Sequence, residues 1–87
     1  MKTAGIGLLL LAGILWAQVD INHAKTKELM ALHGIGKKKA RAIVRYRKKH
    51  CFEEPRDIIK VKGIGKKIFQ KNRHLIVAGS CDDKKAE

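Results

Sequence analysis

Apolar residues fall into one long run and then into short, spaced groups. The run covers residues 4–15 and contains no charge. Beyond Gln18, apolar positions recur among charged ones at spacings of three and four residues, which is typical of amphipathic helices rather than strands. The pattern predicts an all-α fold of about four to five short helices, with no strand pattern longer than a few residues.

The charged part of the chain repeats itself with an offset of 29 residues. Glu28–Lys38 aligns with Asp57–Lys67, and both segments end in Gly-Ile-Gly-Lys-Lys. Agreement at about eight positions is unexpected by chance in so short a chain. Each copy predicts a short helix, a tight turn and a second helix.

Helix start and stop signals surround the first turn. Asn22 is a suitable N-cap for the first helix. Gly34 ends that helix, because glycine adopts the left-handed conformation cheaply. The next helix is predicted at roughly residues 37–49. The expected apolar stripes are Leu29, Met30 and Leu32 on the first helix, and Ala40, Ile43 and Val44 on the second.

The second copy has similar signals. Residues 50–54 form a linker in which Phe52 is expected to fill the core. Pro55 suits the first position of a helix and Asp57 its first turn, where negative charge is favoured. This helix is expected to end by Lys62. The last helix is predicted at roughly 66–72, with Ile68 and Phe69 inward, and Leu75, Ile76 and Val77 closing the core.

Residues 1–17 differ from the rest of the chain. Lys2 precedes an apolar stretch that is shorter than the roughly 20 residues needed to span a bilayer. The segment matches a secretory signal peptide cut after Ala17, with an uncleaved anchor as the alternative because Leu15 stands where a small residue is preferred. The predicted organisation is a signal peptide at 1–17, a domain at 18–78 and a charged tail at 79–87, and the predicted location is secreted or periplasmic.

The chain is strongly basic, with a net charge of +12 from 20 Lys and Arg against 8 Asp and Glu. Loss of residues 1–17 removes one cation and leaves 70 residues at +11. Such charge opposes compaction unless a polyanion is present. The composition therefore favours nucleic acid or an anionic membrane as partner, with plain solubility as the alternative.

Two cysteines, Cys51 and Cys81, would lie in an oxidising compartment after secretion. A bond between them would close a loop of about 30 residues and stabilise the fold by roughly 3–4 kcal/mol. Free or intermolecular thiols are the alternative.

Signs of catalysis are missing from the sequence. No Ser-His-Asp set, paired carboxylate or motif nucleophile stands out, so neither an enzyme nor a small-molecule substrate is expected. The histidines and cysteines are spaced unlike zinc fingers, so no metal or other cofactor is expected.

The glycine turns suit phosphate. A helix N-terminus offers unpaired N–H groups and the positive end of the dipole, and glycine lets an anion approach closely. Lysines are unfavourable in a first helical turn, so their repetition there points to an anion that offsets them; a solvated charge run is the alternative. The isoleucines between the glycines are expected mainly to brace the turns in the core. The candidate DNA-binding residues are Gly34, Ile35, Gly36, Lys37, Lys38, Lys39, Arg41, Gly63, Ile64, Gly65, Lys66 and Lys67.

Other cations crowd the second helix. Arg41 lies one turn from the first hairpin and is therefore included among the candidates. The rest are expected mostly to be solvated, with some extending the DNA face. They are Arg45, Arg47, Lys48 and Lys49.

Leu32–Lys37 and Val61–Lys67 resemble the helix-hairpin-helix motif. Val19–Ala24, Ile43–Arg47 and Phe52 are similar to the DNA-binding domain of ComEA-like competence proteins. The resemblance covers about residues 19–77. It implies a tandem (HhH)2 fold that binds double-stranded DNA without sequence preference.

The resemblance also implies particular contacts and a cellular role. The glycine backbones and the lysines that follow them would contact phosphate. The role would be a periplasmic receptor for DNA uptake in natural transformation, with an inner-membrane DNA channel as a further partner. His33 stands where the family often has proline, which makes the first turn less rigid. The alternatives are an intracellular DNA-repair accessory module and a secreted cationic membrane-active protein.

Overall fold

The computed structural model describes residues 18–81, and the predicted signal peptide and the end of the charged tail lie outside them. Along the chain the elements are β1 (Val19–Asp20), α2 (Thr26–Leu29), α3 (Lys37–Lys49), the 3₁₀ helix η1 (Pro55–Lys60), α4 (Lys66–Asn72) and β2 (Ile76–Val77). The all-α class is confirmed. None of the helices in the described part is long and apolar enough to cross a membrane.

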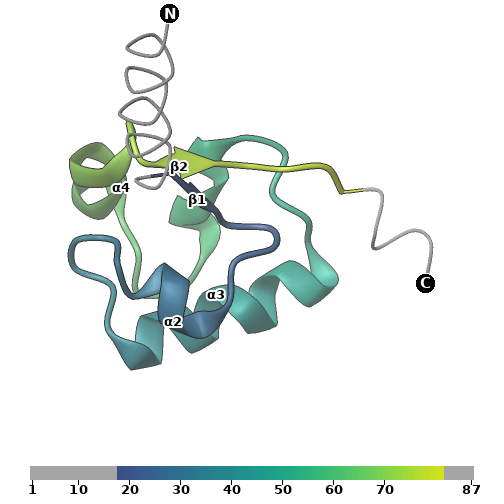
Figure 1. The fold of residues 1–87 in the computed structure, drawn as a ribbon, viewed down its shortest axis with the longest axis horizontal. Helices are drawn as coiled ribbons and strands as arrows, with labels where there is room; N and C mark the ends of the chain where they lie inside the picture. Colours follow the sequence, from purple (N-terminus) through teal and green to yellow (C-terminus); the bar gives the residue numbers. More distant parts are fainter. Residues whose placement is uncertain (1–17, 82–87) are drawn as a thin grey trace, which may run out of the picture.

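The short strands β1 and β2 join the two ends of the domain (Figure 1). They pair in parallel, with Val19 opposite Ile76 and Asp20 opposite Val77. The sequence predicts no strand here, because two-residue strands are too short to show an alternating pattern. Val19 and Ile76 are both buried, so the pair also closes the core between the two copies of the repeat.

The first helix, α2, is shorter than its signals suggest. It has only four residues and begins after Lys25, so the predicted N-cap role of Asn22 is wrong. The side chain of Glu28 instead accepts a hydrogen bond from the backbone N–H of Lys25, at 2.7 Å. Met30, expected in the apolar stripe, is 42% exposed, because the chain leaves the helix at this residue.

Helix α3 is the longest helix of the described part and crosses the lower side of the domain in Figure 1. Its bounds match the predicted range, and Ala40 and Ile43 are fully buried. Val44 packs at the edge of the core.

The segment after α3 runs through a linker into η1. Phe52 is completely buried, as predicted, and its ring stacks on Tyr46 at 5.2 Å between ring centroids. Pro55 occupies the first turn of η1, and Asp57 accepts hydrogen bonds from the backbone N–H groups of Glu53 and Glu54. Burial raises the pKa of Asp57, but these backbone bonds and Lys60 outweigh burial and hold the pKa below its ordinary value.

Candidate nucleic-acid interface

Two tight turns connect α2 to α3 and η1 to α4. Each turn begins with a glycine in the left-handed region, with φ of 80° at Gly34 and 93° at Gly63. No other described residue has positive φ. Side chains with a Cβ rarely adopt this conformation, so the fold itself requires glycine at these two positions.

The second glycine of each turn, in contrast, is not required by the fold. Gly36 and Gly65 are the N-caps of α3 and α4, and both have extended backbone that any residue can adopt. A Cβ added at either position would meet nothing within 4 Å. The fold therefore leaves open space in front of both helix N-termini.

Neither of these helices is capped by a side chain. The first backbone bond of α3 runs from Ala40 to Gly36, and that of α4 from Phe69 to Gly65. The N–H groups of the first turn have no acceptor within an α-helix. Each turn thus presents unused donors at the positive end of a helix dipole.

The isoleucine between the glycines faces inward in both turns. Ile35 and Ile64 are each 3% exposed. Their N–H groups donate to the carbonyls of Leu32 and Val61, at 3.2 and 3.0 Å. These two residues hold the turns in the core, and their backbone donors are already engaged.

The lysines that follow the turns are mostly on the surface. Lys37, Lys38, Lys66 and Lys67 are exposed, with no acidic residue in the first turn of either helix. Arg41 is also exposed, three to four residues beyond the first two lysines and hence on the same helix face. The structure thus groups cations around each uncapped N-terminus.

The two hairpins pack against each other through equivalent positions. A Cβ on Gly34 would lie 3.5 Å from Cγ1 of Ile68 in α4, and a Cβ on Gly63 would lie 3.8 Å from Cε of Lys39 in α3. Ile68 and Lys39 are related by the 29-residue offset, as are the two glycines. Lys39 follows the first hairpin in sequence, yet its half-buried side chain lies beside the second.

A buried amide also links the two copies. Asn72, the last residue of α4, is fully buried. Its Oδ1 accepts from the N–H of His33 at 2.8 Å, and its Nδ2 donates to the His33 carbonyl at 2.9 Å and to Ile68 at 2.8 Å. The residue before the first glycine turn is therefore fixed to the second copy.

This role of Asn72 is missing from the predictions. One signal for it was available in the repeat, because Asn72 aligns with the core residue Ile43. A polar side chain at a core position needs a buried partner.

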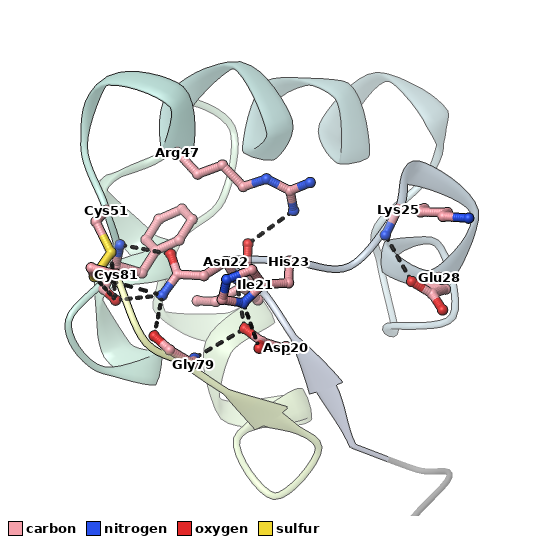
Figure 2. A network of polar contacts seen from close by, with 11 residues as sticks. Asp20, Ile21, Asn22, His23, Lys25, Glu28, Arg47, Cys51, Gly79 and Cys81 are labelled. Carbon is pink, nitrogen blue, oxygen red and sulfur yellow. Dashed lines mark hydrogen bonds and ion pairs between the residues drawn. A yellow bond between two sulfur atoms is a disulfide. The ribbon is translucent and has the colours of Figure 1, made fainter. Parts of the chain in front are cut away.

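A second buried amide, that of Asn22, links three segments of the domain (Figure 2). It is 8% exposed, exchanges hydrogen bonds with both backbone groups of Phe52 at 2.7 and 2.9 Å, and donates to the carbonyl of Gly79 at 2.8 Å. Asn22 thus joins β1, the linker after α3 and the segment after β2.

Asp20 strengthens the same junction. Its carboxylate accepts from the N–H groups of Asn22 and Gly79, at 2.9 and 3.0 Å, and pairs with His23 at 2.8 Å. Burial raises the pKa of Asp20, but the bonds from Gly79, His23 and Asn22 outweigh burial and bring the pKa below its ordinary value. A Cβ on Gly79 would collide with this carboxylate.

Arg47 is a structural residue rather than a solvated cation. Its guanidinium donates to the carbonyl of Ile21 at 3.1 Å, which ties α3 to the chain after β1 (Figure 2). Burial lowers the pKa of Arg47, and Asp20 partly offsets the effect.

The sulfur atoms of Cys51 and Cys81 are bonded, with their Cα atoms 5.9 Å apart. The bridge lies next to the Asn22 junction (Figure 2). No group of three or more His, Cys, Asp or Glu side chains within residues 18–81 could hold a metal ion.

Comparison with known proteins identifies similar sequences. Residues 16–77 match the family described as "Helix-hairpin-helix motif". An uncharacterised protein of Haemophilus influenzae is 45% identical over 62 residues, which cover 69% of this chain and 55% of that protein. ComE operon protein 1 of Bacillus subtilis is 46% identical over 61 residues, which cover 69% of this chain and 30% of that protein. The chain thus spans only part of the length of these curated relatives.

Proposed function

Because this chain belongs to the helix-hairpin-helix family and is ComEA-like, we propose that it binds the sugar-phosphate backbone of double-stranded DNA without sequence preference. Each hairpin would seat a phosphate in front of its uncapped helix. The chain would act without a cofactor and without catalysis.

The observation that carries the proposal is the open space at Gly36 and Gly65. The fold does not require glycine at either position, because the backbone is extended and a Cβ would meet no neighbour. An approaching phosphate does require it, because a side chain there would stand before the free N–H groups. Glycine at both positions is explained by a ligand.

The first-turn lysines support the same ligand. A cation at a helix N-terminus is repelled by the dipole, by about 0.3–1 kcal/mol at exposed positions. Lys37, Lys38, Lys66 and Lys67 are in these unfavourable positions with no acidic residue beside them in the turn. A phosphate bound between the N–H groups and the ammonium groups would reverse that cost.

The likeness to ComE operon protein 1 suggests a role in competence, and we extend the proposal to DNA uptake outside the inner membrane. The signal-like residues 1–17 and the cysteine pair both fit an oxidising location. Mass spectrometry of the N-terminus of the native protein tests this part. A mature chain beginning at Gln18 supports uptake, whereas an intact Met1 on a cytosolic protein would favour a repair role.

DNA binding is tested by reversing charge at the hairpins. A variant carrying Lys37→Glu, Lys38→Glu, Lys66→Glu and Lys67→Glu is expected to lose binding to a random-sequence duplex while keeping its helical circular dichroism. For the wild-type protein, neutralisation of about 4–6 phosphates gives a log–log salt slope of roughly −4 to −5. An unchanged affinity in the variant would reject the proposal.

A further inference from the structure

The surface beside the second hairpin is hollowed into a groove of about 510 Å³ between α3 and the segment that enters the hairpin. Tyr46 and Val61 are among the residues that line it. Its cationic lining residues are Arg45, Lys48, Lys49 and Lys62. All four are exposed, and no acidic residue lines the groove.

Two observations place this groove next to the second hairpin. Lys62 directly precedes Gly63, the left-handed glycine of the turn. Lys39, whose Cε would lie 3.8 Å from a Cβ on Gly63, is on the same α3 helix as the groove residues. The positions 39, 42, 45 or 46 and 49 recur at helical spacing, so they form one stripe along that helix.

The equivalent positions beside the first hairpin carry fewer cations, and Lys71, at the position of Ala42, is the one permanent cation among them. The residues that align with the groove cations in the other copy of the repeat, 29 positions away, are uncharged side chains or histidines. Arg45 aligns with His74, Lys48 with Val77 and Lys49 with Ala78, while Lys62 aligns with His33. The duplication therefore preserves the hairpins and differs in the charge beside them.

We infer that this groove is a second phosphate-binding surface, which holds the backbone of the same duplex beyond the second hairpin. Cations along one side of the hairpin extend the contact in that direction only. The chain would therefore bind DNA asymmetrically, and the second hairpin with its groove would contact more phosphates than the first hairpin. The inference rests on the proposed function and adds to it the residues that decide in which direction the contact extends along the duplex.

The test compares two variants that lose the same charge. The groove variant carries Arg45→Gln, Lys48→Gln, Lys49→Gln and Lys62→Gln. The control variant removes four exposed cations outside the groove and the hairpins: Lys25→Gln, Lys27→Gln, Lys71→Gln and Arg73→Gln. Thermal melting and circular dichroism of both variants check that the fold is kept.

The groove variant should bind a duplex at least tenfold more weakly than the control variant, with a salt slope less negative by about 2 or more. Its affinity should also stop rising at a shorter duplex length than that of the wild-type protein. Equal affinity and slope in the two variants would overturn the inference and leave the proposed function standing. Groove-dependent binding to anionic phospholipid vesicles with unchanged DNA affinity would also overturn it. Failure of the wild-type protein to bind DNA would instead reject the proposed function.

Discussion

The side chain of Asn72 forms a two-way pair with the backbone of His33, so that the end of α4 holds the start of the first glycine turn. The amide of Asn72 accepts from the N–H and donates to the carbonyl of His33, as a backbone residue of a neighbouring strand would, and it thereby joins the two copies of the repeat. It fixes the start of the first hairpin to the second copy of the repeat.

Replacing Asn72 with leucine is expected to destabilise the domain by about 1–3 kcal/mol. Leucine has as many side-chain heavy atoms as asparagine, but the backbone groups of His33 and the carbonyl of Ile68 lose their partner. Urea unfolding measures the loss. Gln70→Leu, at an exposed position of the same helix, serves as control and should stay within about 0.5 kcal/mol of wild type. Equal stability of the two variants would show that the pair contributes nothing.

The two glycines of each hairpin should respond differently to alanine. Gly34→Ala and Gly63→Ala force a Cβ into positive φ and are expected to cost roughly 1–2 kcal/mol each. Gly36→Ala and Gly65→Ala should change stability by less than about 1 kcal/mol, because the backbone is extended and the space is empty.

DNA binding, unlike stability, should be sensitive to alanine at the second glycine of each hairpin. Gly36→Ala and Gly65→Ala are each expected to weaken binding by roughly tenfold or more, the loss of about one charge-assisted hydrogen bond. Fluorescence anisotropy with a labelled duplex, on protein shown to be folded, measures the effect. Wild-type affinity in both variants would mean that phosphate does not approach through this space.

Acid should destabilise the domain through Asp20 and Asp57. The folded-state pKa of each lies below its ordinary value, so their stabilisation is complete above about pH 4 and is lost as pH falls through the folded-state pKa. The melting temperature should therefore drop steeply below about pH 4.

Asp20→Asn isolates one of these groups. The variant should melt below wild type at pH 7, because its amide no longer offers a charged acceptor to Gly79 and Asn22. The gap between the two proteins should narrow toward pH 2, where the wild-type carboxylate is protonated. A gap of constant size across this range would contradict the assignment.

Removing the Cys51–Cys81 bond should lower stability by roughly 3–4 kcal/mol, since the bond restricts a loop of about 30 residues in the unfolded chain. For a domain of this size the melting temperature would fall by roughly 15–25 °C. The double variant Cys51→Ser, Cys81→Ser can be compared with wild type with and without dithiothreitol. The reductant should lower the melting temperature of wild type only.

The sequence predicts much of this fold because its repeat and its glycines are local signals. The bounds of α3, the role of Pro55 and the buried Phe52 are confirmed, as are the ComEA-like family and the all-α class. Each follows from residues a few positions apart, where spacing and conformational preference decide the structure.

Long-range polar contacts account for what the sequence does not predict. Asn22 is a plausible helix cap by local rules, yet it is buried among Phe52 and Gly79, 30 and 57 residues away. Lys39 likewise belongs to the first hairpin in sequence and lies beside the second in space. Neither partner can be identified without knowing how the copies pack. The lysines and glycines of the hairpins stay predictions as DNA contacts until binding is measured.

The position of the disulfide also affects how the domain would survive proteolysis. The loop between Cys51 and Cys81 encloses η1, the second hairpin, α4 and β2, and leaves the first hairpin outside. A protease that cuts once inside this loop would produce two pieces still joined by the sulfur bridge and by the packing of Asn72 and Phe52. A cut in the first hairpin would have no such covalent protection. The second hairpin is thus the one that tolerates a nick, whereas α3, which carries most of the groove cations, lies outside the loop.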